Sequence, residues 1–258
     1  MGLLDGKVAI ITGSDSGIGQ ATAEAFAREG ADVAIAYLHD EDGAEETRRR
    51  VEACGRRAAV FQLDQREPEA VEELFTQAGE RLGTPYILVN NAGIDSTGGQ
   101  VADVSPEDWD NEIRTNLYGP FYCSRRFIRE RRNAGGKGKL INITSVHETI
   151  PRIGSAGYDC AKAGLHMLTR TLCLELAPDH INVNSIAPGM ILTGMNQQAI
   201  DDPKAREKQV QSIPWKRAAQ PSEVADLAVY LASEKSDYVT GQSFVIDGGL
   251  ECNLGQGA

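Results

Sequence analysis

The feature that most constrains the fold is a glycine-rich loop between a short apolar run and an alanine-rich segment. The apolar run at 7–11 is typical of a buried β-strand, and the loop Gly13–Gly19 follows it. Helix-forming residues at 20–30 then lead to a second apolar run at 32–37. This order predicts the opening βαβ unit of a dinucleotide-binding fold, because the helix start offers unpaired N–H groups and partial positive charge to phosphates.

Short apolar runs alternate with amphipathic or alanine-rich segments along the rest of the chain. Strands separated by helices indicate parallel βαβ units. The sequence therefore predicts one α/β domain over 1–258, a Rossmann-type doubly wound parallel sheet of seven strands. The expected strands are 7–11, 32–37, 58–63, 86–90, 139–143, 181–187 and 243–246. The expected helices are 17–29, 41–54, 67–82, 105–131, 156–177 and 221–233.

A tyrosine and a lysine four residues apart carry the strongest chemical signal. Tyr158 and Lys162 project from the same face of the expected helix 156–177. A nearby ammonium lowers the pKa of a phenol, which can then exchange a proton with an alcohol or carbonyl oxygen. Ser145 follows the expected strand 139–143, where its hydroxyl can stabilise an oxygen that gains charge. No His–acid pair or GxSxG motif surrounds this serine, which argues against a nucleophilic role.

Several motifs together resemble the short-chain dehydrogenase/reductase family over residues of about 5 to 250. They are the loop spacing GxxxGxG, Asn90-Asn-Ala-Gly93, Asn116, Ser145, Tyr158-x-x-x-Lys162 and Pro188-Gly189. The resemblance implies the strand order 3-2-1-4-5-6-7 and a catalytic tetrad of Asn116, Ser145, Tyr158 and Lys162. Cofactor contacts are expected from Gly13, Ser16, Gly17, Ile18, Gly19, His39, Asp64, Asn91, Ala92, Gly93, Tyr158, Lys162, Pro188, Gly189 and Thr193.

The resemblance also suggests roles for individual residues of this set. Lys162 would lower the pKa of the tyrosine and bond the nicotinamide ribose. Asn116 would hold a water in the proton relay, although it could also bond backbone at a helix kink, a role nearly compatible with the first. Asp64 would bond the adenine amino group. The irregular segment 188–220 is expected to be a substrate lid that closes over the reacting centre.

The preference between NAD and NADP depends on residues near the end of the second strand. The acidic residue that NAD-specific members usually have there is absent, which removes repulsion against a 2′-phosphate. Ser14 and Leu38 stand where a basic residue often occurs in NADP-preferring members. His39 could donate to a phosphate, whereas Asp15 and Asp40 would repel one. The expected cofactor is NADP(H), with NAD(H) possible.

The stretch 143–151 resembles that of the bacterial glucose 1-dehydrogenase members of the family. Ser145, His147 and Tyr158 are the expected substrate contacts, although His147 and Glu148 could instead stabilise their loop or a subunit contact. The predicted function is interconversion of an alcohol, a sugar or polyol, with its carbonyl. Reduction of small ketones, diketones or 3-oxoacyl thioesters is an alternative, and a non-catalytic nucleotide-sensing protein is a remote one.

Composition argues against several other classes of protein. The formal charge of −11 disfavours nucleic acid and anionic membranes as partners. Five cysteines without CxxC spacing, and no HExxH motif, favour reduced thiols and no metal site. The N-terminus lacks the basic and apolar segments of a leader, so a cytoplasmic location is expected. The family resemblance implies a homotetramer that binds a small-molecule substrate.

Overall fold

Seven parallel strands form one sheet in the order β3-β2-β1-β4-β5-β6-β7, which confirms the predicted fold and strand order. The structure is a computed structural model and describes residues 2–95 and 98–253. The strands are β1 Val8–Thr12, β2 Asp32–Tyr37, β3 Ala58–Gln62, β4 Ile87–Asn90, β5 Gly138–Ile143, β6 Ile181–Pro188 and β7 Ser243–Ile246. Because β1 pairs with β2 on one side and with β4 on the other, the strand order reverses at β1.

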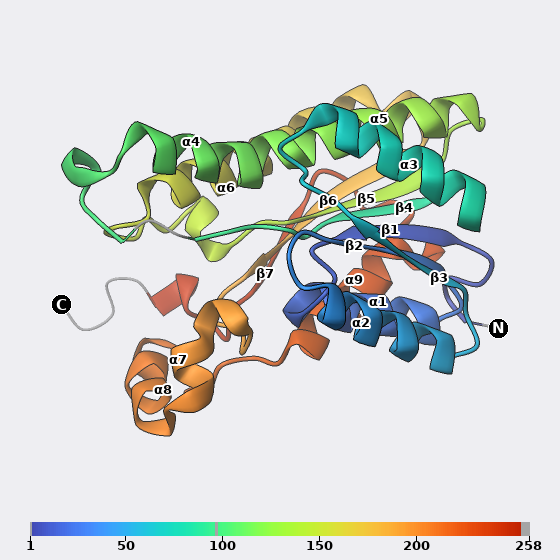
Figure 1. Cartoon of the computed structure of the whole chain (residues 1–258). Coiled ribbons are helices and arrows are strands. Elements are labelled where there is room, and N and C mark those ends of the chain that lie inside the picture. The colour runs from blue at the N-terminus through green and yellow to red at the C-terminus, as the bar shows by residue number, and fades with distance from the viewer. Residues whose placement is uncertain (1, 96–97, 254–258) are drawn as a thin grey trace.

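Helices cover both faces of the sheet (Figure 1). On one face, α1 packs against α2 and α9; on the other, α3 packs against α5 and α4 against α6. The first group is α1 Gly17–Arg28, α2 Glu41–Ala53 and α9 Pro221–Ala232. The second is α3 Pro68–Leu82, α4 Pro106–Ile113, α5 Gly119–Asn133 and α6 Ala156–Glu175.

The sheet divides the apolar core into two clusters. Alternate residues of a strand point to opposite faces, so Ala9 and Ile11 pack in the cluster that contains Phe26 of α1. Ile10 packs on the other face, with Phe127 of α5. A strand covered by helices on both faces is apolar along its whole length, which explains the continuous hydrophobic runs in the sequence.

The prediction of one continuous helix over 105–131 is wrong. The segment consists of α4, a π-helical turn at Arg114–Tyr118, and α5. In a π-helix each N–H bonds to the carbonyl five residues before it, as the Gly119 N–H does to Arg114. Pro120 follows directly and has no N–H to continue either helical pattern. The π turn places Asn116 in the molecule's interior, where it is fully buried.

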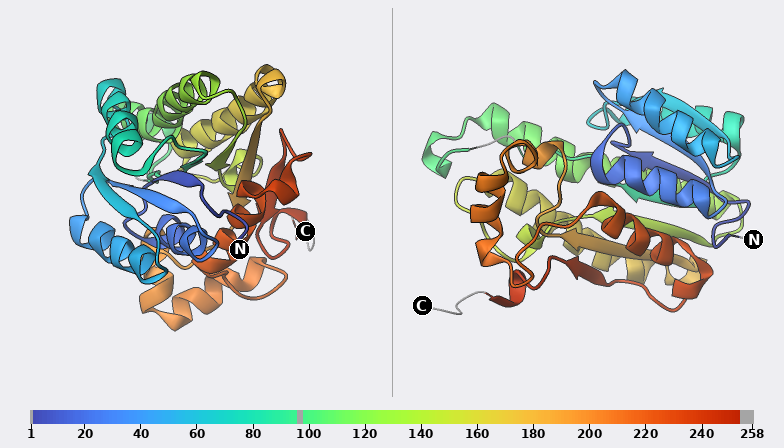
Figure 2. Two further views of the ribbon diagram at one scale, coloured as in Figure 1. Left: turned by 90° about the vertical axis from the view of Figure 1, so that its right-hand side faces the viewer. Right: turned by 90° about the horizontal axis from the view of Figure 1, so that it is seen from below.

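The segment 188–220 is more regular than the sequence suggests. It contains two short helices, α7 Gln197–Asp201 and α8 Pro203–Gln209. These helices extend beyond the carboxyl ends of the strands, at the lower left of Figure 1, and Figure 2 shows them projecting from the sheet. The segment therefore stands beside the sheet edge where ligands bind in such folds. Within the described ranges, no helix is long and apolar enough to cross a membrane.

Candidate active site

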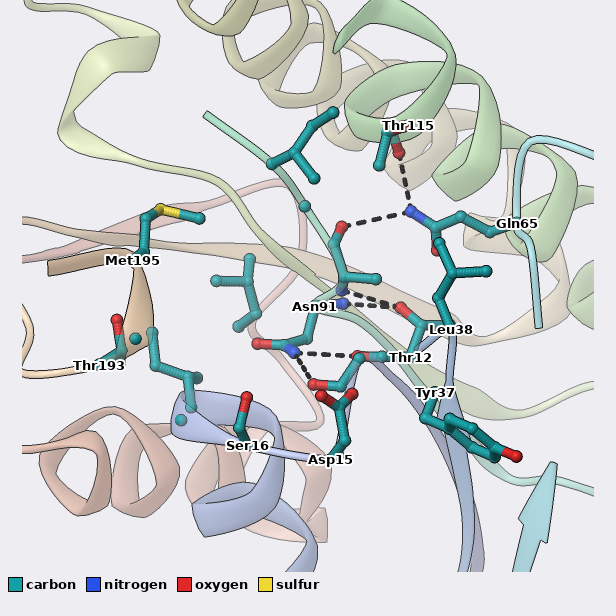
Figure 3. Close-up of a pocket in the computed structure, with 18 of the residues that line it drawn as sticks. Thr12, Asp15, Ser16, Tyr37, Leu38, Gln65, Asn91, Thr115, Thr193 and Met195 are labelled. Atoms are coloured by element: carbon teal, nitrogen blue, oxygen red, sulfur yellow. Dashed lines mark hydrogen bonds between the residues drawn. The ribbon is translucent and has the colours of Figure 1, made fainter. Parts of the chain in front are cut away.

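A cavity of about 460 Å³ opens at the carboxyl ends of the strands, at the point where the strand order reverses. Figure 3 shows residues from β1, from the segments after β2, β3 and β4, and from the 188–220 segment around it. The predicted site residues that line it are Gly13, Ser16, Gly17, Ile18, His39, Asp64, Asn91, Ala92, Gly93, Ser145, Tyr158, Lys162, Pro188, Gly189 and Thr193. Gly19, Asn116 and His147 are not among its lining residues.

The glycine loop forms one wall of the cavity and leads into α1. Gly13 has φ +59°, and a Cβ there would lie 2.8 Å from the Ala92 Cα. A Cβ on Gly19 would lie 2.2 Å from the Gly13 carbonyl oxygen, so Gly19 lets α1 pack against the loop. Ser16, the N-cap of α1, makes no side-chain capping bond, and the first turn has no acidic residue. The first N–H groups of α1 thus remain open to an anion in the cavity.

The ends of β1 and β4 are tied together across the floor of the cavity. The Thr12 hydroxyl accepts hydrogen bonds from the N–H groups of Asn91 and Ala92, at 3.1 and 3.0 Å. The Asn91 side-chain amide donates to the carbonyls of Thr12 and Gly13, at 2.9 and 2.7 Å (Figure 3). The amide N–H groups of Asn91 are therefore used to hold the glycine loop against the end of β4.

The tyrosine and lysine lie together, as their spacing predicts. The Lys162 Nζ is 5.5 Å from the centre of the Tyr158 ring and donates to the Ile143 carbonyl at 2.9 Å. Burial raises the pKa of Tyr158 to about 12, although its hydrogen bond with Ser145 acts against this. Burial also lowers the pKa of Lys162 to about 8, while the charge of Glu148 acts in the opposite direction. The expectation of a lowered tyrosine pKa is therefore wrong for this structure, because burial outweighs the hydrogen bond with Ser145.

Asn116 stands behind the cavity wall. Its Oδ1 accepts the N–H of Ile94 at 3.0 Å, and its Nδ2 donates to the carbonyl of the same residue at 2.8 Å. A Cβ built on Gly93 would lie 2.7 Å from the Asn116 Oδ1 and 3.4 Å from the Lys162 Nζ. The asparagine and the lysine therefore flank the same stretch of backbone.

His147 and Glu148, predicted as a possible polar pair for substrate, point in different directions. The His147 ring lies 6.2 Å from the Tyr158 ring, and its Nδ1 is 2.8 Å from the Ile150 carbonyl. The buried Glu148 carboxylate accepts from the Ser243 hydroxyl at 2.6 Å and lies 3.1 Å from the His166 Nδ1. Glu148 therefore links α6 to β7 and contributes no surface to the cavity.

Charged residues gather at the end of the cavity next to β2 and β3. The Asp64 carboxylate is paired with Arg66 at 2.6 Å, which lowers its pKa. Burial, helped by the charge of Asp40, raises the pKa of Asp15. Ser14 stands where NADP-preferring members often have a basic residue. It is fully buried and donates to the Ile11 carbonyl, so it cannot face a phosphate. In residues 2–95 and 98–253, no group of three or more His, Cys, Asp or Glu could hold a metal.

Sequence reasoning missed several residues that line the cavity. They are Thr12, Tyr37, Gln65, Arg66, Ile94, Thr115, Ile143, Thr144, Ile191, Gly194, Met195 and Asn196. Many of them directly follow a strand or lie within three residues of a predicted contact, so the strand ends themselves were a usable signal. Thr115 is different, because it lies in the π turn and follows no strand.

A family model described as enoyl-(acyl carrier protein) reductase matches residues 13–251. Glucose 1-dehydrogenase 2 of Bacillus subtilis is 39% identical over 247 residues, which are 96% of this chain and 95% of that protein. The chain belongs to the short-chain dehydrogenase/reductase family.

Two further members of the short-chain dehydrogenase/reductase family are similar along nearly their whole length. The 3β-hydroxysteroid dehydrogenase 1 of Eggerthella lenta is 42% identical over 251 residues, 96% of this chain and 94% of that protein. The crystal structure of acetoin dehydrogenase from Enterobacter cloacae has a TM-score of 0.89 and 38% identity, with 98% of each chain covered. The chain is therefore an NAD(P)-dependent oxidoreductase that interconverts alcohols and carbonyls.

Proposed function

We propose that this protein oxidises a sugar or polyol alcohol to its carbonyl, and catalyses the reverse reduction, with Ser145, Tyr158, Lys162 and Asn116 as its catalytic residues. One observation carries the proposal: the serine, the tyrosine and the lysine line the same cavity as the glycine loop at the start of α1. An alcohol held by the serine and tyrosine would thus stand beside a bound nicotinamide. Similarity to a glucose 1-dehydrogenase supports a sugar or polyol as the substrate.

The nicotinamide dinucleotide, when bound, supplies the hydride acceptor or donor. Gly13, Ser16, Gly17, Ile18 and Gly19 form the glycine loop and first turn of α1 that would hold its phosphates. The open N–H groups of α1 fit that role, and a Cβ on Gly17 would lie 3.2 Å from the Thr193 side chain, so the wall is narrow there. His39, Asp64, Asn91, Ala92, Gly93, Pro188, Gly189 and Thr193 would complete the contacts.

The proton is moved by this chain's own residues. Ser145 donates to the substrate oxygen, and the Tyr158 hydroxyl takes the proton of an alcohol or returns one to a carbonyl. An unaided phenol with a pKa of about 12 would be a poor base at neutral pH. Lys162 lies close to the Tyr158 ring, and its pKa is about 8. At neutral pH its ammonium would therefore place a positive charge beside the phenol. Asn116 would hold the water that passes the proton toward solvent.

NADP(H) is the cofactor we propose, with NAD(H) tolerated. The second strand ends in Tyr37 and continues into Leu38, so no carboxylate at that point repels a 2′-phosphate. His39 also lines this end of the cavity. Asp15 and Asp40 act against a phosphate and are the reason to expect NAD(H) to be used as well.

A small-ketone reductase is the second candidate. The acetoin dehydrogenase of Enterobacter cloacae is 38% identical and covers 98% of this chain, which supports a small hydroxyketone or diketone as substrate. Both candidates use the same proton and hydride chemistry. They differ in the size and polarity of the substrate, over which the 188–220 segment would close as a lid.

We further propose that the enzyme is a single-domain homotetramer acting in the cytoplasm. All five cysteines are free thiols, which suits a reducing compartment. Tyr118, Phe121, Met167 and Leu174 leave apolar surface exposed on α5, α6 and the turn before α5, which suits contacts between copies. Light scattering at micromolar concentration would test this, and a monomeric mass would contradict it.

Initial rates with NADP+ and NAD+, measured on a panel of aldoses, polyols, acetoin and diacetyl, would test the function. We expect turnover of at least one sugar or polyol, with Tyr158→Phe reducing kcat/KM by roughly 10²- to 10⁴-fold, the range for loss of a general acid–base. Tyr238→Phe is the control, because Tyr238 is fully exposed and should leave the rate unchanged. Activity confined to acetoin and diacetyl would favour the second candidate, and full activity in Tyr158→Phe would refute the mechanism.

A further inference from the structure

Gln65 follows β3 and connects two segments of the site that are remote in sequence. Its Nε2 donates to the Thr115 carbonyl at 2.7 Å and to the Ala92 carbonyl at 3.3 Å (Figure 3). The side chain is 5% exposed, and its Oε1 has no hydrogen-bond partner within the described part of the chain. Burying an amide costs free energy unless it is hydrogen-bonded. The two bonds to the Thr115 and Ala92 carbonyls offset that cost for the Gln65 N–H groups.

The Thr115 carbonyl needs a donor from outside its own helix. In the π pattern its partner would be the N–H of the residue five positions later, which is Pro120 and has none. In the α pattern its partner would be the Gly119 N–H, which bonds the Arg114 carbonyl instead. The carbonyl is thus free to accept the Gln65 amide, and the π turn is completed by a side chain from a different strand end.

The backbone next to this contact is shaped to admit the glutamine. A Cβ on Gly119 would lie 2.5 Å from the Gln65 Cγ and 2.7 Å from its Cδ. Any larger residue at 119 would therefore displace the amide from the Thr115 carbonyl. The glycine has an ordinary helical φ of −55°, so it is the space, and not the backbone conformation, that requires it.

The two carbonyls that Gln65 joins belong to the segments that hold Asn116. Thr115 precedes the asparagine in the π turn, and Ala92 lies two residues before Ile94, whose N–H and carbonyl the asparagine bonds. The Gln65 and Asn116 side chains therefore hydrogen-bond the same two segments at adjacent points. Without the Gln65 bonds, the Asn116 bonds to Ile94 remain to hold the π turn against the 91–94 segment.

We propose that Gln65 is a positioning residue, which keeps Asn116 aligned behind the nicotinamide end of the cavity by completing the π turn and tying it to the 91–94 segment. This inference rests on the proposed function only for its effect on rate. Its structural part, the closure of the π turn, holds whatever the substrate is. Within the described residues the Gln65 amide bonds the Thr115 and Ala92 carbonyls and neither Ser145 nor Tyr158, so we expect its loss to affect proton transfer through Asn116 more than binding of the dinucleotide.

The first experiment uses Gln65→Met, which preserves length and removes the donor. We expect kcat to fall about tenfold, with the KM for the dinucleotide changed less than twofold. In the Asn116→Ala background the same substitution should add little, because the asparagine is then no longer there to be aligned. Gln77→Met is the matched control, since Gln77 lies on α3 and its amide donates to the exposed Glu73 side chain, the amide's one hydrogen bond among the described residues. A wild-type kcat in Gln65→Met, or a full additional loss in the double variant, would overturn the proposal.

The second experiment does not depend on activity. Hydrogen–deuterium exchange by mass spectrometry should show faster exchange in peptides covering 91–95 and 114–121 of Gln65→Met, with the remaining sheet unchanged. Gly119→Ala, which keeps the glutamine and displaces it, should reproduce this result, and Gly119→Ala with Gln65→Ala should be milder than Gly119→Ala alone. Unchanged exchange in both single variants would overturn the proposal. A wild-type protein with no turnover on any substrate would instead contradict the proposed function and leave this test intact.

Discussion

Replacing Lys162 by methionine is predicted to stabilise the protein at pH 7 while abolishing turnover. The lysine is 4% exposed, and burial lowers its pKa from 10.5 to about 8. One pKa unit corresponds to about 1.4 kcal/mol, so keeping this ammonium charged at pH 7 costs about 3 kcal/mol. Methionine removes that cost but loses the hydrogen bond from the charged ammonium to the Ile143 carbonyl, worth about 2 kcal/mol. The free energy of unfolding should therefore rise by about 1 kcal/mol.

The way the stability difference changes with pH tests whether the buried ammonium is its cause. The pKa of Lys162 is lower in the folded state than in the unfolded state, so the unfolded chain binds more protons between pH 8 and 10.5. The wild type consequently gains stability as the pH rises through that window, and the advantage of Lys162→Met shrinks. Tyr158 acts oppositely, because its raised pKa makes the folded state less stable above pH 10. That effect is small below pH 10, where the two proteins are compared.

Urea unfolding at pH 7 and pH 9.5, at one fixed protein concentration, measures this difference. Lys139→Met is the control, because Lys139 is equally buried but bonds Asp237 at 2.6 Å and Asn182 at 3.0 Å. It should lose about 2 kcal/mol, since hydrogen bonds to charged groups are broken without relief of an unpaired ammonium. A Lys162→Met protein less stable than wild type at pH 7, or one whose advantage is the same at both pH values, would refute the reasoning.

Two further predictions concern the dinucleotide. Gly19→Ala places a Cβ 2.2 Å from the Gly13 carbonyl oxygen, so α1 must shift, and thermal-shift measurements should show lost stabilisation by NADP+ or NAD+. Gly98→Ala, where a Cβ meets nothing within 4 Å, is its control, and retained stabilisation in Gly19→Ala would contradict the prediction. Asp15→Asn removes a carboxylate from the adenosine end, so the NADP+/NAD+ ratio of kcat/KM should rise roughly tenfold. An unchanged ratio would mean that the carboxylate does not face the ribose.

The sheet was predictable because its strands are short and mainly apolar, and each is separated from the next by a helix-forming or irregular segment. Buried strand positions appear in the sequence as short apolar runs, which located the strands. Their order in the sheet followed from the family resemblance. The break at 114–118 was not predictable from periodicity. Pro120 limits how the helical pattern can continue, but the Asn116 side chain also bonds the backbone of Ile94, which is distant in sequence and is brought near only by the fold.

The site was predictable as a set of residues and less so as an electrostatic environment. Spacing put Tyr158 and Lys162 on one face, but the sign of the tyrosine pKa shift depends on burial, which no local pattern reports. Glu148 illustrates the same limit. Adjacent to His147 in sequence, it turns toward Ser243, a partner from the last strand of the sheet.

The pairing of β1 with β4 has a consequence for how the protein is made. The floor of the cavity is formed where Thr12 and Asn91 bond across these strands, and β4 follows β2 and β3 in the chain. During synthesis β2 can pair with one side of β1, but the other side has no partner until β4 emerges, and non-local parallel pairing of this kind is slow. Because this floor forms only when β1 and β4 meet, a dinucleotide would stabilise the folded sheet after that pairing and not before it.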